Sequence, residues 1–269
     1  MVAQHLGKTD LIILPEAALP ALENQLQPFF QGLQRVAERS NTEVMVGSIF
    51  LDENTDKLLN SIVVTGNAQQ PYDLATANRY NKHHLVPFGE YVPLENILRP
   101  LGSVFNLPMS AFQSGELVQP PLMAKARSFL PAICYEIIFG DQLQKNLRPD
   151  TDFLLTLSND AWFGTSIGPW QHLQMARMRA LELGKPLIRA TNTGISVFVD
   201  AKGKILAQAP QFEETTLSYN IAPTTGKTPY AVLGDKPLYW LSAVLFAIHF
   251  FGRWLKGKLL KLASARGEK

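Results

Sequence analysis

Short apolar runs bounded by turn residues recur along most of the chain and predict buried strands. Residues 11–14 form such a run before Pro15, and residues 152–157 form another. Between the runs lie segments with helical patterning, most clearly residues 170–183, where Gly184 gives a normal helix stop. Alternating strands and helices predict an α/β layered domain with a mixed sheet or a pair of sheets. Further strands are expected at residues 43–50, 58–65, 127–135, 187–191, 195–200, 204–207 and 215–221, and further helices at residues 21–39 and 137–146.

The C-terminal part of the chain has a different pattern, because residues 237–251 (PLYWLSAVLFAIHFF) carry no formal charge. The run is shorter than the about 20 apolar residues of a typical membrane-spanning helix, but Trp254 and Leu255 extend it. Basic side chains near its end can snorkel, and their clustering predicts a cytoplasmic C-terminus by the positive-inside tendency. A helix buried on the domain or in a dimer interface is the alternative.

These patterns divide the chain into four parts. We expect a folded domain at residues 1–222, a linker at 223–236, a transmembrane helix at 237–256 and a basic cytoplasmic tail at 257–269. The folded domain then lies on the opposite side of the membrane from the tail.

Composition narrows the classes of function. The chain has 269 residues, enough for one large α/β domain, and a formal net charge of +2. No interleaved basic and aromatic stripe accompanies this nearly neutral charge, so nucleic acid is not an expected partner. One cysteine cannot form an intrachain disulfide or a thiolate-rich zinc site, and the five histidines show no metal-ligand spacing. Neither a metal nor another cofactor is therefore expected.

Three residues with chemically active side chains lie next to predicted strands. Glu16 follows the run at residues 11–14, Lys82 precedes a loop with proline and glycine, and Cys134 lies at a strand-to-helix junction. Each has an ordinary interpretation: an acid at a helix N-terminus, a solvated lysine, and a small buried core residue. Each also has a functional one, since a buried carboxylate must be paired or functional, and a thiol near a helix N-terminus has a lowered pKa.

The combination of these three residues indicates covalent catalysis. A thiol nucleophile needs a base to take its proton, and it needs a positive group or N–H donors where an oxyanion develops. Strand ends converge on one edge of the sheet in a layered α/β domain, so the three side chains can meet there. We expect Cys134 to carry a covalent intermediate, Glu16 to carry protons and Lys82 to stabilise negative charge.

The segments around these residues resemble the nitrilase superfamily, whose members use a Cys-Glu-Lys triad on an αββα sandwich. The resemblance is more specific to the apolipoprotein N-acyltransferase family and covers nearly the whole chain. It rests on five ordered motifs, LPEAALP, NKHHLVPFGEYVP, ICYEIIFGD, LSNDAWFG and RATNTGISVFVDAKGKI. The resemblance implies a nitrilase-like αββα sandwich, followed by one C-terminal apolar helix that spans a membrane.

The resemblance also implies a reaction, the transfer of an acyl chain in two steps at the bacterial inner membrane. Cys134 would attack the ester of a phospholipid, with phosphatidylethanolamine as the expected donor, and hold the acyl chain as a thioester. The α-amine of a diacylglyceryl-cysteine apolipoprotein would then accept the acyl chain. Glu16 would relay the protons, and Lys82 would stabilise the oxyanion, a contribution of about 3 to 4 kcal/mol for such a donor. The catalytic domain would face the periplasm.

Matching motif positions imply further site residues. Glu90 and Glu136 would orient Lys82 or balance the charge of the site, whereas Tyr135 is either a supporting residue or a packed aromatic. The expected supporting residues are Glu90, Tyr135 and Glu136, and the expected substrate-binding residues are Asn159, Trp162, Phe88 and Tyr91.

The sequence departs from the family at its beginning. The family's N-terminal transmembrane helices and the first strand of the sandwich are not found before Glu16, so the chain resembles the C-terminal catalytic portion. Two other functions are therefore weighed. One is a nitrilase-type amidase that hydrolyses a small amide, and the other is a truncated domain that binds lipid or lipoprotein without turnover. The apolar C-terminal run argues against the amidase, and the intact triad argues for an enzyme.

Overall fold

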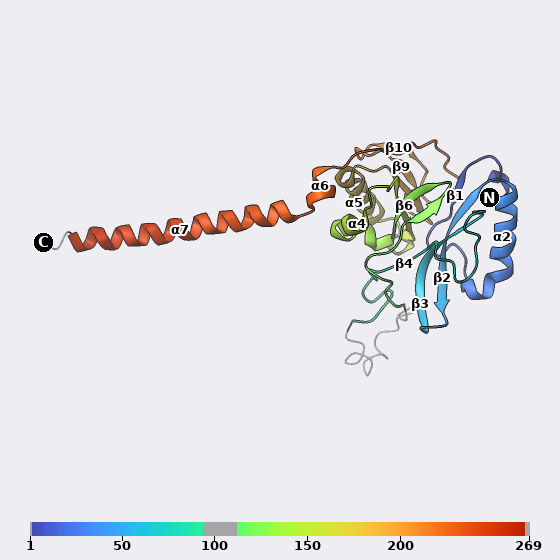
Figure 1. Ribbon diagram of the computed structural model, residues 1–269, viewed down its shortest axis with the longest axis horizontal. Helices are drawn as coiled ribbons and strands as arrows, with labels where there is room; N and C mark the ends of the chain where they lie inside the picture. Colours follow the sequence, from blue (N-terminus) through green and yellow to red (C-terminus); the bar gives the residue numbers. More distant parts are fainter. Residues whose placement is uncertain (1, 94–111, 267–269) are drawn as a thin grey trace. The chain divides into compact units, whose positions relative to one another are not determined.

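The computed structural model describes residues 2–93 and 112–266, with side chains as far as residue 256. The chain divides into two compact units, Met1–Lys227 and Thr228–Lys269. All strands of the described residues belong to the first unit, where Figure 1 shows them in two sheets.

The two sheets have different sizes and strand directions. Their strands are β1 (Leu11–Ile13), β2 (Glu43–Asp52), β3 (Lys57–Thr65), β4 (Arg79–Asn81), β5 (Leu122–Ala124), β6 (Arg127–Ile133), β7 (Phe153–Ser158), β8 (Leu187–Thr191), β9 (Val197–Val199) and β10 (Ile205–Gln208). The smaller sheet has the order β1-β2-β3-β4, with β1 parallel to β2 and the other pairs antiparallel. The larger sheet has the order β10-β9-β8-β7-β6-β5, with β6, β7 and β8 mutually parallel. The carboxyl ends of parallel strands lie at one edge of the sheet, and the candidate site lies at this edge.

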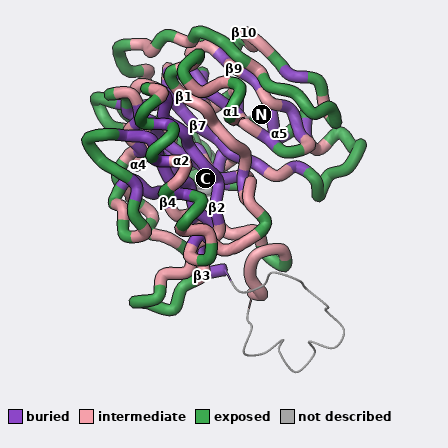
Figure 2. Tube along the Cα trace, turned by 90° about the vertical axis from the view of Figure 1, so that its right-hand side faces the viewer, coloured by how far each residue is buried: buried purple, intermediate pink, exposed green. Residues whose placement is uncertain are grey.

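The facing sides of the two sheets form the central core of the first unit. Met45 and Ile62 of the smaller sheet belong to one buried cluster with Phe129, Ile133 and Leu155 of the larger sheet. Figure 2 shows the buried positions following the strands through this unit, while exposed positions follow the outer loops. Apolar side chains point inward from both sheets, as expected for two sheets packed face to face.

Helices cover the outer faces of the two sheets. Helix α2 (Gln27–Arg39) packs on the smaller sheet through Phe30 and Ala37. Helices α4 (Gly140–Asn146) and α5 (Gly168–Leu183) pack on the larger sheet, on the opposite side from α2 (Figure 1). The order of layers is helix, sheet, sheet, helix, so the αββα sandwich expected from the sequence is confirmed.

Some expected elements have different limits in the structure. The helix expected at residues 21–39 begins only at Gln27, after a 3-10 turn η1 (Glu23–Leu26), and Pro28 lies in its first turn, where no N–H is needed. The strand expected at residues 127–135 ends at Ile133, because Cys134 adopts a positive φ and begins the 3-10 helix η3 (Cys134–Ile138). Short helices not expected from the sequence include α1 (Val2–His5) and η4 (Asp160–Phe163).

The strand expected at residues 215–221 is wrong. In the structure this segment has no regular secondary structure. The larger sheet ends at β10 within the described residues, and the segment forms no ladder with this edge strand, because β propensity alone does not make a strand without favourable packing.

The second unit consists of helices α6 (Pro229–Leu233) and α7 (Lys236–Arg266). The part of α7 from Lys236 to Lys256 is 21 residues long, has a mean hydropathy of 1.3 and is not buried, so it is long and apolar enough to cross a membrane. One C-terminal apolar helix is therefore confirmed. The boundaries expected at residues 222, 236 and 256 stay predictions, and the side chains of the expected tail 257–269 lie outside the described residues.

A buried ion pair ties η1 to the smaller sheet. Glu23 is fully buried, and Arg79 of β4 reaches it with two guanidinium nitrogens, one of them 2.7 Å from Oε2. The hydroxyls of Ser48 and Tyr72 donate to the same carboxylate at 2.7 and 3.0 Å. Donors therefore reach both oxygens, which offsets the cost of burying this charge.

Removing Arg79 should destabilise the fold strongly. Arg79→Met leaves the Glu23 carboxylate buried without its cation, which costs about 3 to 5 kcal/mol of unfolding free energy. Urea unfolding followed by circular dichroism measures the loss. Arg127→Met is the matched control, because Arg127 is exposed and lies 3.6 Å from Asp152, and the loss of this pair should cost at most about 1 kcal/mol. Similar losses in the two variants would contradict this account of the Glu23 pair.

Candidate active site

Glu16 lies where the chain leaves β1 and crosses closely over β2. A Cβ at Gly47 of β2 would come within 2.3 Å of the Pro15 carbonyl oxygen, so this close passage requires glycine at position 47. The Ala18 N–H donates to the Gly47 carbonyl oxygen at 3.0 Å and fixes the crossing. This crossing sets the position of Glu16 in the folded chain.

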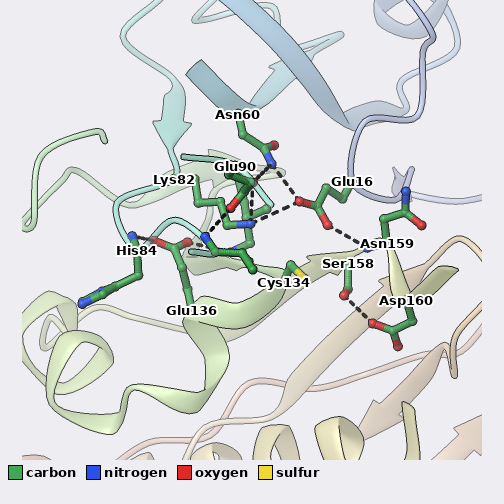
Figure 3. Close-up of polar contacts among 12 residues, drawn as sticks. Glu16, Asn60, Lys82, His84, Glu90, Cys134, Glu136, Ser158, Asn159 and Asp160 are labelled. Atoms are coloured by element: carbon green, nitrogen blue, oxygen red, sulfur yellow. Dashed lines mark hydrogen bonds and ion pairs between the residues drawn. The ribbon is translucent and has the colours of Figure 1, made fainter. Parts of the chain in front are cut away.

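The Glu16 carboxylate is held by three donors, and the residue is only 6% exposed. Asn60 Nδ2 donates to Oε1 at 2.7 Å, and the backbone N–H of Asn159 donates to Oε2 at 2.7 Å. Lys82 Nζ lies 3.4 Å from Oε1. Figure 3 shows these groups converging on Glu16. The carboxylate therefore has a fixed direction, as a proton carrier requires.

Lys82 follows β4 directly and lies between two carboxylates. Its side chain is 1% exposed, and Nζ lies 2.9 Å from Oε1 of Glu90, which belongs to the loop that follows. Burial alone would lower the pKa of Lys82, but the negative charges of Glu16 and Glu90 outweigh it and raise the pKa above its usual range. Lys82 is therefore a cation at neutral pH.

Glu90 fixes its own loop as well as Lys82. Its Oε2 accepts the backbone N–H of Val86 at 2.8 Å, and its Oε1 accepts Asn60 Nδ2 at 3.1 Å. Asn60 thus bridges the Glu16 and Glu90 carboxylates. The two acids are held apart from each other by one amide and one ammonium group.

Cys134 begins η3 with a strained backbone. Its φ of 52° lies in the left-handed region, which costs a non-glycine residue about 1 to 2 kcal/mol. Figure 3 shows the sulfur among Lys82, Glu16 and Ser158. The prediction of a lowered thiol pKa at a helix start is wrong for this site. Desolvation and the charge of Glu16 raise the pKa of the Cys134 thiol to about 11. Lys82 and the Ser158 hydroxyl act in the opposite direction but do not outweigh them.

This arrangement can perform nucleophilic catalysis. A thiol with a raised pKa needs a base at the moment of attack, and Glu16 is the fixed carboxylate beside it. Lys82 supplies a positive charge in a partly dry site, where it stabilises a developing oxyanion more than it would in water. Among the described residues, no group of three or more histidine, cysteine, aspartate or glutamate side chains could hold a metal ion.

Glu136 holds the backbone beside two of these groups. Its carboxylate is fully buried and accepts the backbone N–H of Ile133 at 2.8 Å and that of His83 at 2.7 Å. Ile133 precedes Cys134, and His83 follows Lys82. One carboxylate thus fixes the chain next to the nucleophile and next to the ammonium group, and it acts on Lys82 through the backbone.

A second buried network reaches Cys134 through its carbonyl oxygen. Asp160 is 1% exposed. Its two carboxylate oxygens accept hydrogen bonds from Arg189 Nη2 at 2.7 Å and from the Ser158 hydroxyl at 2.6 Å. His172 of α5 lies 3.2 Å from Asp160 through Nδ1 and 3.0 Å from the Cys134 carbonyl oxygen through Nε2. Desolvation acts to raise the pKa of Asp160, but the bond to His172 and the charge of Arg189 lower it to about 2.

Comparison with known proteins identifies the family of the chain. Residues 1–230 match the carbon-nitrogen hydrolase family. The chain belongs to this family. Solved structures with the same fold include the carbon-nitrogen hydrolase from Helicobacter pylori G27, at 17% identity and a TM-score of 0.57 over 77% of this chain and 76% of that one. Saccharomyces cerevisiae Nit3, a member of the nitrilase superfamily, has 20% identity and a TM-score of 0.55 over 79% of this chain and 77% of that one.

Curated relatives are much more similar in sequence than these structures. The apolipoprotein N-acyltransferase of Haemophilus influenzae is 70% identical over 259 residues, which are 96% of this chain and 50% of the relative. The enzyme of the same name from Pasteurella multocida is 66% identical, again over 96% of this chain and 50% of the relative. The chain spans about half the length of these curated relatives.

Three of the residues expected to support catalysis or bind substrate are exposed. Trp162 of η4 is 75% exposed, and Phe88 is 48% exposed. Tyr135, beside Cys134, is 37% exposed and packs edge-on against Phe139. These aromatic rings are open to a ligand.

The other two expected substrate residues make local contacts. The side chain of Asn159 accepts the Ala161 N–H at 3.2 Å and caps η4, so Asn159 reaches Glu16 through its backbone. Tyr91 is half-buried, and its carbonyl oxygen accepts the Phe88 N–H at 2.8 Å.

Sequence reasoning missed several residues of the candidate site. The only local signal for Asn60 is its polarity within the apolar strand β3. The structure joins His172 and Asp160 in one network, which no local pattern of the sequence indicates. The other missed residues are Tyr80, whose hydroxyl contacts Glu136, and Ser158 and Arg189, which contact Asp160.

Neutralising Glu16 should make Cys134 easier to ionise. Glu16→Gln removes a negative charge that raises the pKa of the thiol, so the pH of half-maximal alkylation by iodoacetamide should fall below the value of about 11 expected for the parent. Intact mass spectrometry across a pH series measures this midpoint. Glu214→Gln, at an exposed position, is the control and should leave the midpoint unchanged. The same midpoint in Glu16→Gln and the parent would refute the assigned electrostatics.

Proposed function

We propose that this chain carries the catalytic domain of an enzyme that moves an acyl chain from a phospholipid to the N-terminal amine of a diacylglyceryl-cysteine apolipoprotein. The observation that carries the proposal is the single thiol of the chain, half-buried beside a fixed carboxylate and a fixed ammonium group. The 70% identity to a relative named apolipoprotein N-acyltransferase supports this acyl transfer over other reactions of a thiol nucleophile.

The first half-reaction loads Cys134. Glu16 takes the thiol proton, and the sulfur attacks the carbonyl carbon of the phospholipid ester. The carbonyl electron pair moves to oxygen, where Lys82 and the backbone N–H of Tyr135 stabilise the negative charge. The ester C–O bond then breaks, Glu16 returns the proton to the departing oxygen, and a lysophospholipid leaves while the acyl chain stays on sulfur as a thioester.

The second half-reaction unloads the thioester. The α-amine of the diacylglyceryl-cysteine attacks the thioester carbonyl, and Glu16 accepts the proton that the nitrogen loses. The C–S bond breaks, the proton returns to the sulfur of Cys134, and the N-acylated lipoprotein leaves. Lys82 stabilises the oxyanion of both tetrahedral intermediates, so one fixed charge serves both steps.

The supporting residues act on this chemistry in different ways. Glu90 orients Lys82, and Glu136 fixes the backbone on both sides of the site. Tyr135 is exposed beside Cys134 and supports the site. The exposed Phe88 and Trp162, together with Tyr91 and Asn159, contact the two lipid substrates. Aromatic side chains suit acyl chains, because they bury large apolar areas.

The reaction is proposed to occur at the bacterial inner (plasma) membrane. The span Lys236–Lys256 has the length and hydropathy of a crossing helix, and Arg253 and Lys256 lie near its end. The positive-inside tendency then puts the C-terminus in the cytoplasm and the catalytic domain on the periplasmic side. Phosphatidylethanolamine is the proposed donor, and both substrates are lipids of the membrane itself.

The proposed reaction passes through a covalent intermediate that mass spectrometry can detect. After incubation with phosphatidylethanolamine in detergent, intact mass spectrometry should show a gain of one acyl chain, and Cys134→Ala should show none. A diacylglyceryl peptide should remove the gain and become acylated. Discharge by water alone would favour a hydrolase, such as a nitrilase-type amidase. No gain on a protein shown to be folded would sink the proposal and leave lipid or lipoprotein binding without turnover.

A further inference from the structure

His172 links a buried ion pair to the strained residue Cys134. It lies on α5 with 6% exposure, and its ring faces Asp160 and Arg189 on one side and the Cys134 carbonyl oxygen on the other. The ring is also near the ring of Phe163, with centroids 6.3 Å apart. None of these contacts is part of the two half-reactions described above.

The partners of His172 decide where its protons lie. A carbonyl oxygen only accepts hydrogen bonds, so Nε2, at 3.0 Å from the Cys134 carbonyl, must carry a hydrogen. Arg189 only donates, and its Nη2 lies 3.1 Å from Nδ1. With Nε2 protonated, Nδ1 accepts from Arg189 Nη2 in the neutral ring, or donates to Asp160 in the imidazolium, and the second of these is the bond that lowers the pKa of Asp160. The bond to Cys134 is present in either form.

The ring has little freedom to turn away from Cys134. Asp160 and Arg189 form an ion pair of 2.7 Å with both side chains fully buried, and this pair holds Nδ1. Gly194 closes the far side of Asp160, because a Cβ there would come within 2.1 Å of Oδ2. This closely packed ion pair therefore fixes the orientation of the His172 imidazole.

We propose that His172 is a positioning residue for the nucleophile. Its Nε2–H holds the Cys134 carbonyl oxygen and so keeps Cys134 in the left-handed conformation, with φ of 52°, that directs the sulfur toward Glu16 and Lys82. The identity of Cys134 as the reacting atom rests on the proposed function, but the conformational role of His172 does not.

The left-handed conformation needs a specific restraint of this kind. A non-glycine residue leaves that region unless its surroundings hold it there. Glu136 restrains the N–H of the preceding residue at 2.8 Å, and His172 restrains the carbonyl of Cys134 itself. Without His172 the peptide after Cys134 can rotate. The sulfur then moves away from Glu16, and the N–H of Tyr135 loses its direction as well.

Two amide variants separate this role from packing. The Gln amide nitrogen takes a place close to His Nε2, whereas the Asn amide takes a place close to Nδ1 and cannot reach the Cys134 carbonyl. His172→Asn should lower the pH of half-maximal alkylation by iodoacetamide from about 11 toward the ordinary cysteine value of about 8.5. Thioester formation from phosphatidylethanolamine should slow by about 100-fold in the same variant, as for a misplaced nucleophile. His172→Gln should stay near the parent in both measurements.

Arg179→Leu is the matched control on the same helix. Arg179 donates to the Ile138 carbonyl oxygen at 3.3 Å, which joins α5 to the other end of η3. Thermal unfolding of every variant is followed by circular dichroism. Arg179→Leu should lower the unfolding temperature and leave the alkylation midpoint of Cys134 at the parental value.

Each outcome decides for or against the role of His172. A parental midpoint in His172→Asn, or equal shifts in His172→Asn, His172→Gln and Arg179→Leu, would overturn it. Alkylation needs no phospholipid, so a parent that forms no thioester would refute the proposed function while the midpoints still tested His172. If His172→Asn does not fold, a midpoint in His172→Gln far below the parental one would also overturn the proposal.

Discussion

The rest of the site depends on the burial of the Lys82 ammonium group between two carboxylates. Burying such an ion costs several kcal/mol unless its partners are in place, and here they come from separate segments: Glu16 from the end of β1 and Glu90 from the loop after β4. Asn60 of β3 bonds to both carboxylates. The charge of one side chain thus requires three segments to meet, and the geometry for catalysis is the same geometry that makes the lysine tolerable.

Cys134 is held in a different way, through its backbone. Glu136 accepts the N–H of the preceding residue, and His172 holds the carbonyl oxygen of Cys134 itself. Both restraining side chains belong to buried networks of hydrogen bonds. A nucleophile must form and break a covalent bond, so a strong fixed hydrogen bond to the sulfur would have to be broken in every cycle. Restraint of the main chain avoids this cost, and it leaves the sulfur free to change partners while its starting position stays defined.

The layered architecture could be predicted from the sequence, because apolar runs and helix stops are local patterns. The residues Glu16, Lys82 and Cys134 could be singled out for the same reason, since each stands beside such a run. The network of His172, Asp160 and Arg189 could not, because these residues are 12 and 29 positions apart and meet only in the fold. The strand expected at residues 215–221 shows the converse: β-forming residues do not make a strand by themselves, because pairing depends on how the segment packs in the fold.

The short strand β1 has a consequence for the behaviour of the protein on heating. It contains three residues and pairs with β2 alone in the described part of the chain, so it lies at an edge of its sheet. Edges open by local fluctuation more readily than strands paired on both sides. Glu16 lies just beyond β1, and the base would therefore leave Lys82 before the core between the sheets melts. Catalysis would be lost by subglobal opening, at a temperature where the bulk of the secondary structure is still intact.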